Sequence, residues 1–363
     1  MILPMRSITF NRPWATWALS SLLVLGTLGL MTGCTPSSPT DSEQKPATGD
    51  TKPAEGKTIS VGIVFDSGGL GDKSFNDSAW RGIQKAETEF GIKVSKVESK
   101  EEKDYETNLA AMADDGNDLV IAVGLNQGKA LEKVAPMYPD TKFAIVDGTV
   151  EAPNVRMLKF KEEEGSYLVG FLAGKMTKTA KVGFVGGQEL DLIKKFEYGF
   201  AAGVKAANPQ AELLPAKYIG SWDNIDEAKI AANVLFDSGA DIVYHAAGRA
   251  GLGVIRAAKD RNLFAIGVDS DQDGEAPGNV LTSMIKNVDE AVYSTIKDMV
   301  DGKFEAGEKI YDVAQNGVGI SELTHTRDKV GPDLLAEIMA VKQAIADGTT
   351  KVPATKAEFD AMK

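Results

Sequence analysis

The chain has 363 residues, of which 43% are hydrophobic and 25% are charged, and its formal net charge is −12. This acidic excess argues against binding to nucleic acid or to anionic lipid surfaces, because both attract positively charged proteins. The single cysteine, Cys34, excludes disulfides within the chain and cysteine-based zinc sites.

The first 33 residues have the pattern of an export signal. Arg6 and Arg12 precede an apolar run, residues 14–31, which leads to Gly33 and Cys34. A run of about 18 apolar residues also suits a retained membrane helix, which is the alternative interpretation. The Gly-Cys junction resembles the lipobox of bacterial lipoproteins, where cleavage before the cysteine leaves a lipidated thiol. We therefore expect a signal peptide over residues 1–33 and a lipid anchor on Cys34, at the extracytoplasmic or periplasmic face of the cell membrane.

Residues 34–57 are rich in Pro, Ser, Thr and charge and contain no large apolar side chains. Such a segment cannot bury enough surface to fold, so we expect a disordered tether. A flexible chain of this length has a root-mean-square reach of about 25 to 30 Å. The residues that follow exceed what one hydrophobic core usually holds, and this favours two lobes.

The stretch "VGIVFDSGGLGDKSFNDSAWRG", residues 61–82, leads from a strand pattern through a glycine-rich turn into a helix. A Walker-type phosphate loop is excluded, because Asp72 separates Gly71 from Lys73. The dinucleotide fingerprint also fails, and the carboxylates of Asp66 and Asp72 would repel a pyrophosphate. This loop is therefore expected to bind something other than a nucleotide's phosphates.

Short Val- and Ile-rich runs alternate with amphipathic stretches through the rest of the chain. A helix is predicted over residues 75–90, where apolar residues recur at spacings of three and four and Ser74 is the expected N-cap. Runs that are apolar on both faces predict parallel sheets covered by helices on both sides. Most of these runs end in Gly or Asp, and ligands of such sheets bind beyond the carboxyl ends of the strands.

The alternation of strands and helices breaks near residues 154–176 and then starts again, so we expect the chain to cross from one lobe to the other there. A second crossing between the lobes is expected near residues 280–292. We therefore expect lobe 1 to comprise residues 58–160 plus about 288–320. Lobe 2 is expected to comprise residues 161–287 plus about 321–363. Two lobes joined by several crossings predict a hinged clamshell.

A series of motifs between about residues 58 and 320 resembles the basic membrane protein family of substrate-binding lipoproteins, which includes the purine nucleoside receptor of nucleoside-importing ABC transporters. The motifs are "FDSGGLGDKSFNDSAWRG", "FKEEEGSYLVGFLAG", "KVGFVGGQELDLIKKFEYGFAAGVKAANP", "YIGSWDN", "HAAGRAGLGVI", "IGVDSDQ" and "LTSMIKNVDEAVYSTIKD". The resemblance implies an α/β fold of the type I periplasmic-binding-protein kind, a two-lobed clamshell. It also implies a monomer that binds a nucleoside without a cofactor and delivers it to an ABC permease.

The resemblance further implies which residues bind the ligand. Phe75 and Trp222 would stack on the two faces of the base, and base stacking is worth roughly 1 to 3 kcal/mol. Asp269 and Lys286 would hold the ribose, because a carboxylate accepts from two vicinal hydroxyls while an ammonium donates to the same oxygens. Gly248 would allow the backbone to approach the sugar. From the residues alone, a core Phe and solvated charges are the alternatives.

Asp66 and Asn76 flank the glycine-rich turn and are expected to face the edge of a neutral base that is rich in donors. The family commonly has an acidic residue in the loop before "ALEKVA", where this chain has Lys129. Asn126 or Gln127 is therefore expected to reach the base instead.

The two histidines, His245 and His325, are interpreted as structural, and no metal site is expected. The run Glu162–Glu164 is interpreted as the solvated start of a helix. A binder of riboflavin or a sugar is the alternative within the same class. An exported nucleoside hydrolase and an adhesin or signalling lipoprotein are the alternatives from other classes. A hydrolase would need a paired acid and base or a metal.

Overall fold

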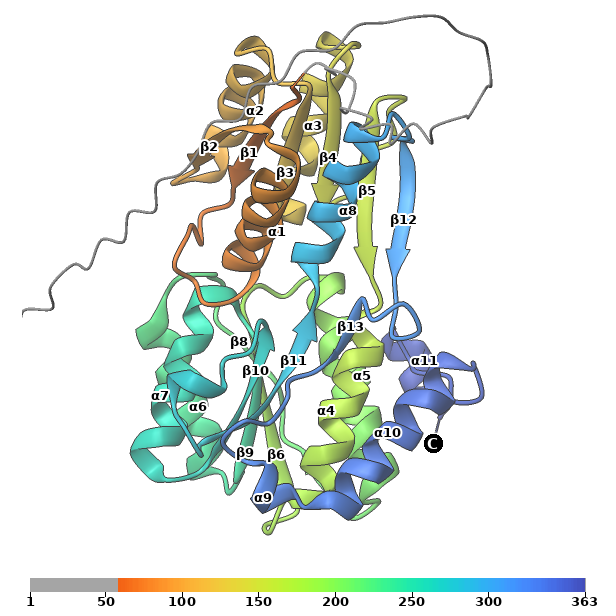
Figure 1. Cartoon of the computed structure of the whole chain (residues 1–363). Helices are drawn as coiled ribbons and strands as arrows, with labels where there is room; N and C mark the ends of the chain where they lie inside the picture. The colour runs from red at the N-terminus through yellow and green to blue at the C-terminus, as the bar shows by residue number, and fades with distance from the viewer. Residues whose placement is uncertain (1–57, 363) are drawn as a thin grey trace, which may run out of the picture. The chain divides into compact units, whose positions relative to one another are not determined.

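The computed structural model describes residues 58–362, which belong to one compact unit (Figure 1). The signal peptide, the lipid anchor on Cys34 and the tether are predictions about residues outside this range. None of the helices described is both long and apolar enough to cross a membrane.

The first sheet has the strand order β12-β5-β4-β3-β1-β2, and its described strands pair in parallel. Helices α1 and α8 pack on one face and α2 and α3 on the other, because the strands are apolar on both sides. The strands are β1 Ser60–Phe65, β2 Lys93–Glu98, β3 Leu119–Val123, β4 Lys142–Val146, β5 Val155–Phe160 and β12 Gly307–Tyr311. The helices are α1 Phe75–Phe90, α2 Tyr105–Asp114, α3 Gly128–Val134 and α8 Val288–Val300.

The second sheet has the order β13-β11-β10-β9-β6-β7, with β8 also paired to β6. Its strands are β6 Lys181–Gly186, β7 Glu212–Leu213, β8 Lys217–Tyr218, β9 Ile242–Ala246, β10 Phe264–Asp269, β11 Val280–Lys286 and β13 Val318–Ile320. One face is covered by α4 Glu162–Met176 and α5 Asp191–Ala207. The other face is covered by α6 Ile225–Asp237 and α7 Leu252–Arg261. The C-terminal helices are α9 Arg327–Val330, α10 Pro332–Ala346 and α11 Lys356–Ala361.

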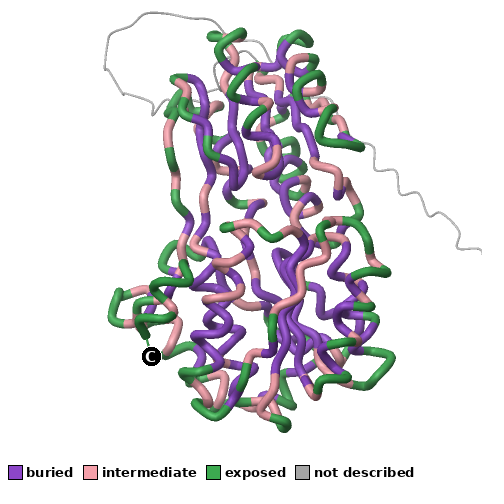
Figure 2. Tube along the Cα trace, turned by 180° about the vertical axis from the view of Figure 1, so that it is seen from behind, coloured by how far each residue is buried: buried purple, intermediate pink, exposed green. Residues whose placement is uncertain are grey.

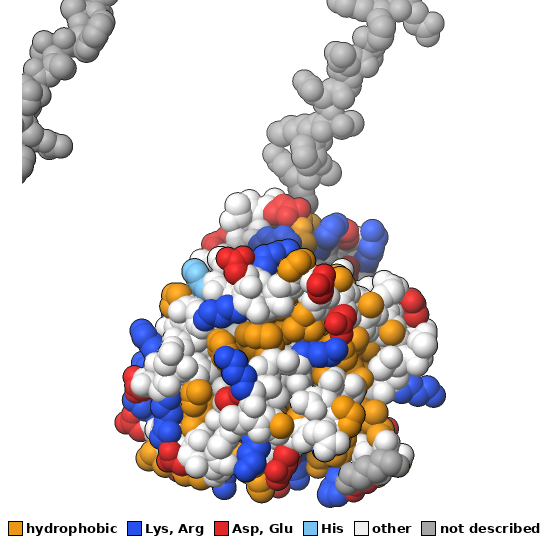
Figure 3. All heavy atoms as spheres, turned by 90° about the horizontal axis from the view of Figure 1, so that it is seen from below, with side chains coloured by type: hydrophobic (Ala, Val, Ile, Leu, Met, Phe, Trp, Pro, Cys, Tyr) orange, Lys and Arg blue, Asp and Glu red, His pale blue; other side chains and the backbone are white. Residues whose placement is uncertain are grey.

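Short 3-10 turns complete the secondary structure; they span Glu102–Asp104, Leu125–Gln127, Ala135–Met137, Gly248–Gly251 and Asp273–Glu275. The central strands are buried along their length, whereas the outward faces of the helices are exposed (Figure 2). Figure 3 shows the lower end of the molecule of Figure 1, where acidic and basic side chains of the described residues are interspersed.

We call the first sheet and its helices lobe 1, and the second sheet with its helices and the C-terminal segment lobe 2. Within residues 58–362 the chain crosses between them three times, before α4, before α8 and before β13. The predicted α/β fold with parallel sheets flanked by helices is thus confirmed. The lobe boundaries stay a proposal, adjusted at one point: β13 pairs antiparallel with β11, so the last crossing comes before Val318 rather than near residue 320.

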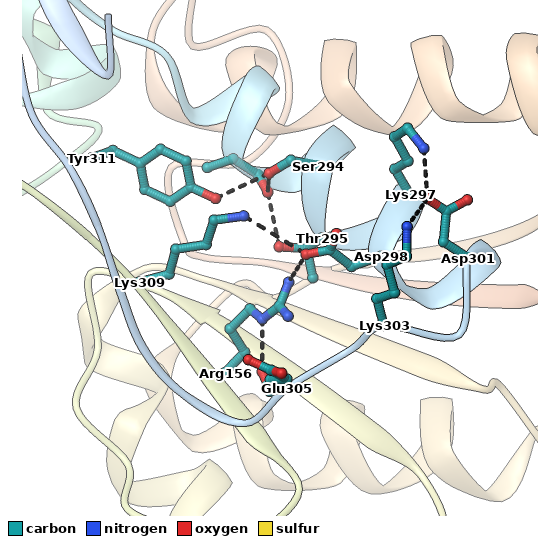
Figure 4. A network of polar contacts seen from close by, with 11 residues as sticks. Arg156, Ser294, Thr295, Lys297, Asp298, Asp301, Lys303, Glu305, Lys309 and Tyr311 are labelled. Atoms are coloured by element: carbon teal, nitrogen blue, oxygen red, sulfur yellow. Dashed lines mark hydrogen bonds and ion pairs between the residues drawn. The ribbon is translucent and has the colours of Figure 1, made fainter. Parts of the chain in front are cut away.

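A polar network fastens the segment that returns to lobe 1, which comprises α8 and β12 (Figure 4). Arg156 on β5 is buried, and its guanidinium bonds Asp298 on α8 at 2.6 Å and the backbone oxygen of Glu305 at 2.8 Å. Ser294 on α8 shares a 3.0 Å hydrogen bond with Tyr311 on β12. Specific contacts between residues far apart in the sequence therefore hold this segment on lobe 1.

Glycines let α4 and α5 pack at very short range in lobe 2. A Cβ atom on Gly203 would lie 2.1 Å from the backbone oxygen of Tyr167, and one on Gly199 would lie 2.3 Å from that of Glu163. Any side chain at these positions would force the helices apart. This contact fixes the first turn of α4, where Glu162 lies beside the site described next.

Candidate functional site

A cavity lies between the lobes, at the carboxyl ends of strands from both sheets. It encloses about 630 Å³ of space that protein atoms do not fill, part of it open to solvent. The residues that follow or end strands and line this cavity are Asp66, Gly124, Asp147, Ala246, Asp269 and Lys286. Both lobes therefore contribute to one site.

Two carboxylates stabilise the glycine-rich turn after β1 by accepting hydrogen bonds from its backbone. Asp72 accepts hydrogen bonds from the backbone N–H groups of Ser74 at 2.9 Å and Asn76 at 2.8 Å, and thus caps α1. Asp77 accepts from Gly71 at 2.7 Å and so closes the loop. Ser74 is the N-cap residue of α1, as predicted, but its side chain does not cap the helix, because its hydroxyl donates to Asp269 in lobe 2 at 2.5 Å.

Asn76 and Asp66 form the polar end of the cavity. The Asn76 amide nitrogen donates to Asp66 at 2.8 Å and to Asp72 at 3.1 Å. These two acceptors fix the orientation of the amide, so its oxygen, Oδ1, is buried without a hydrogen-bond partner among the described residues. Burial raises the pKa of Asp66 to about 6, although hydrogen bonds from Asn76 and Gly68 oppose this shift. This end of the cavity is therefore rich in acceptors.

Three aromatic side chains line the cavity: Phe75 at the start of α1, Phe196 on α5 and Trp222 in the loop before α6. Trp222 packs against Gly187, where a Cβ atom would lie 2.4 Å from the indole ring. Its backbone oxygen accepts a hydrogen bond from Ala250 at 2.9 Å. Gly248 also lines the cavity and has a positive φ of 56°, which glycine adopts at least cost.

Asp269 ends β10 and is almost fully buried. Its backbone has a φ of 64°, in the left-handed region that few residues other than glycine adopt, and Asp147, which also lines the cavity, has a φ of 67°. Burial raises the pKa of its carboxyl group to about 7, while Lys286 and the hydrogen bond from Ser74 lower it.

Lys286 ends β11 and connects the lobes through a buried ion-pair cluster. Its ammonium donates to both carboxylate oxygens of Asp147 in lobe 1, at 2.8 and 2.7 Å. It also lies 3.0 Å from Glu162 Oε1, outside good hydrogen-bonding geometry. Burial lowers the pKa of Lys286, but the charges of Asp147 and Glu162 raise it above the ordinary value overall. The expected ribose donor is thus largely committed to carboxylates, and at most one N–H is left for a ligand.

Gln127 is the predicted site residue that the structure does not bring to the cavity. It is fully buried, and its amide donates at 2.9 Å to the backbone oxygens of Val64 and Val123, at the ends of β1 and β3. Its expected contact with a base is therefore corrected to a structural role. Asn126 does line the cavity and donates to Glu102 at 2.8 Å. Lys129 is exposed and does not line it.

Sequence reasoning missed several lining residues. Asp147 follows β4, so the general rule that polar strand ends bind ligands could have identified it. Arg249 bridges the lobes, because its guanidinium donates to the backbone oxygen of Leu70 at 2.7 Å. Ile193 and Phe196, on the first turns of α5, form an apolar wall. A helix that begins at a cavity leaves no distinctive signal in the sequence.

The run Glu162–Glu164 is buried, so its interpretation as a solvated helix start is wrong. Glu162 faces Lys286, and Glu164 pairs with Lys161 at 3.0 Å. His245 is buried, with Nε2 at 3.1 Å from Gln272, and burial lowers its pKa to about 4. No cluster of His, Cys, Asp and Glu within residues 58–362 has the arrangement of a metal site.

The family model described as "ABC transporter substrate-binding protein PnrA-like" (Bmp) matches residues 59–356. The chain is 38% identical over 361 residues to a CD4+ T-cell-stimulating antigen of Listeria innocua, covering 93% of this chain and 98% of the relative. It is 32% identical over 356 residues to the ABC transporter nucleoside-binding protein BmpA of Lactococcus lactis, covering 92% and 97%. Basic membrane protein A of Borreliella burgdorferi is 33% identical over 308 residues, with 83% and 89% covered.

Among solved structures, an ABC transporter solute-binding protein of Aeropyrum pernix is similar with a TM-score of 0.76 and 28% identity. The similarity covers 84% of this chain and 96% of that one.

Proposed function

Because the chain belongs to the Bmp family of PnrA-like substrate-binding proteins of ABC transporters, we propose that it binds a purine nucleoside in the cavity between its lobes and delivers it to a permease. The observation that carries this proposal is the composition of the cavity. Three aromatic side chains, a polar end rich in acceptors and a buried carboxylate meet there from both lobes. The name of the Lactococcus relative, a nucleoside-binding protein, agrees with such a ligand.

In this proposal the base lies between Phe75 and Trp222. A stacked ring accepts any base, since every base has a π-face, and it contributes roughly 1 to 3 kcal/mol. Gly187 supports the indole from behind, so the stacking surface is held in place before the ligand arrives.

The edge of the base is proposed to meet Asp66 and Asn76. The unpartnered Oδ1 of Asn76 is a buried acceptor, and leaving it unsatisfied costs roughly 1 to 3 kcal/mol. A base with ring N–H donors, such as guanine or hypoxanthine, satisfies this acceptor. Adenine has no ring N–H at the corresponding position, so guanosine and inosine are the favoured ligands.

The ribose is proposed to bind Asp269, because one carboxylate can accept from two vicinal hydroxyls. In this assignment Lys286 supports the site mainly through its ion pairs and contributes little to binding the sugar directly. Its ion pairs with Asp147 and Glu162 hold the cavity floor together, and its remaining N–H is the only donor it offers to the sugar.

A thermal-shift panel tests the proposal. A ligand at a hundred times its dissociation constant adds about 2.7 kcal/mol to the free energy of unfolding. We expect nucleosides to raise the melting temperature by several degrees, and free bases, riboflavin and sugars to raise it less. A larger shift with riboflavin or a pentose would instead favour those ligands. Chromatography of the nucleoside after incubation should return it intact, and released base would indicate a hydrolase.

We also propose that Cys34 anchors the protein at the extracytoplasmic face of the membrane, because it is the only thiol and follows a signal-peptide pattern. Replacing Cys34 by serine should move the protein from the membrane fraction to the soluble fraction, since the acyl chains can no longer be attached. Immunoblotting of fractionated cells measures this. Unchanged membrane association of the variant would show that residues 14–31 remain as a membrane helix.

A further inference from the structure

A second cavity lies in lobe 2, between the first turn of α4 and the C-terminal segment. It encloses about 1020 Å³ of space that protein atoms do not fill, part of it open to solvent. Its walls come from the start of α4, the end of α10, the turn at residues 348–353 and α11. Within the described chain it shares no lining residue with the cavity between the lobes. We call it the hinge cavity, because Lys161 and Glu164 in its wall contact two crossings between the lobes.

Those contacts are specific. The backbone N–H of Lys161 donates to the backbone oxygen of Tyr311 at 3.0 Å, and Glu164 accepts from the backbone N–H of Val313 at 2.9 Å. The first crossing and the last crossing are therefore joined at the edge of this cavity.

Helix α11, which forms one wall of the cavity, is held in place by packing and by a capping box. Phe359 on α11 stacks on Tyr198 of α5, with ring centroids 6.1 Å apart, and Figure 1 shows α11 beside α5. A capping box holds the start of the helix, where Glu358 accepts from the backbone N–H groups of Ala354 at 2.8 Å and Thr355 at 3.0 Å. The cavity is thus bounded by packed structure on this side.

One carboxylate oxygen in the cavity wall lacks a hydrogen-bond partner. Glu163 is only 8% exposed, and its Oε2 atom has no hydrogen-bond partner in residues 58–362. The other two acids of the wall are occupied, Glu164 by Lys161 and Val313, and Glu358 by the capping box. A buried carboxylate oxygen without a donor is costly, so it marks a position where a donor from a ligand would be favourable.

We propose that the hinge cavity binds a small aliphatic amine, whose ammonium group pairs with Glu163 and whose carbon chain lies against Ile345, Val352 and Pro353. The three apolar side chains and Glu163 all line the cavity, so a ligand needs one charged end and an apolar body. A neutral alcohol of the same length would make the same apolar contacts but would bring no positive charge to Glu163. This proposal does not depend on nucleoside binding.

The charges around Glu163 determine how binding should depend on pH. Burial raises the pKa of Glu163 to about 7, the charge of Glu162 on the same helix raises it further, and Lys195 on α5 lowers it. Lys161 and Glu164 neutralise each other, while Lys351 and Glu358 face the cavity from the C-terminal segment. Because the ammonium needs an ionised partner, affinity should rise between pH 6 and pH 8.

The test is a titration of the full chain with n-pentylamine, followed by ligand-observed NMR, with 1-pentanol as the neutral control. At pH 8 we expect saturable binding of the amine, at least tenfold tighter than that of the alcohol, and severalfold weaker binding at pH 6. Glu163→Gln should weaken amine binding about tenfold and remove its pH dependence. Glu337→Gln, an exposed carboxylate on α10 outside the cavity wall, is the matched control and should change nothing.

Lys351→Glu provides a second test at an exposed position that tolerates substitution. The added negative charge should strengthen amine binding severalfold. Equal affinity for amine and alcohol in the unaltered protein, or unchanged amine affinity in Glu163→Gln, would overturn the proposal.

Discussion

Replacing Lys286 by methionine is expected to lower the free energy of unfolding by about 3 to 5 kcal/mol. The substitution keeps the apolar stem but leaves Asp147 and Glu162 as buried carboxylates without their counterion. Urea unfolding at pH 7 measures the loss. Lys85→Met is the matched control, because Lys85 forms an exposed pair with Glu290 at 2.7 Å, and its loss should stay below about 1 kcal/mol.

The pH dependence of this effect follows from the direction of the pKa shift. The folded protein raises the pKa of Lys286 above its ordinary value of 10.5, so its stabilising contribution is fully present below that pH and is lost only at more alkaline pH. In the variant, acid should recover part of the loss, because burial raises the pKa of Asp147 and protonation removes its uncompensated charge. A loss below 1 kcal/mol at pH 7 would mean that the cluster does not hold the lobes as described.

Replacing Asp269 by alanine is expected to erase a preference for ribonucleosides over 2′-deoxynucleosides of about 10- to 100-fold, the size of one or more hydrogen bonds to a charged acceptor. Calorimetric titration with guanosine and deoxyguanosine measures both affinities. Since burial raises the pKa of Asp269 to about 7, the preference of the unaltered protein should be larger at pH 8 than at pH 6.

Trp222→Ala is the matched comparison for Asp269. It removes one stacking surface and should weaken all nucleosides alike, by roughly 1 to 3 kcal/mol, without changing the preference for ribose. If the Asp269 variant still prefers ribose as strongly as the unaltered protein, the ribose assignment is wrong, and the neighbouring Asp271 is the next candidate to replace.

The sequence predicted the parts of the fold and site that depend on local pattern. Apolar runs ending in Gly or Asp identified the strands, and Asp66 and Asp269 lie at strand ends beside the cavity, as the rule for parallel sheets expects. The motif series indicated the family, and the family model confirms it.

What the sequence could not predict depends on contacts between distant residues. Glu162–Glu164 looks like a solvated charge run, but the close approach of α4 and α5 and the C-terminal segment bury it. Lys286 meets Asp147, 139 residues away, only because β4 and β11 end at the same point between the lobes. Gln127 lies one residue past a true lining residue, and the geometry of the 3-10 turn Leu125–Gln127 directs it into lobe 1 instead.

Which side chain caps α1 also could not be predicted from the sequence. Ser74 and Asp72 are both good capping residues, and local preference does not choose between them. The choice is made by lobe 2, because Asp269 takes the Ser74 hydroxyl and leaves Asp72 to cap the helix.

A crystal structure of the protein grown with guanosine tests the central proposal most directly. We expect one nucleoside in the cavity between the lobes, with the base between Phe75 and Trp222, its N–H edge on Asn76 and Asp66, and the ribose hydroxyls on Asp269. An empty cavity at saturating guanosine, or a nucleoside bound elsewhere with these residues uncontacted, would contradict it.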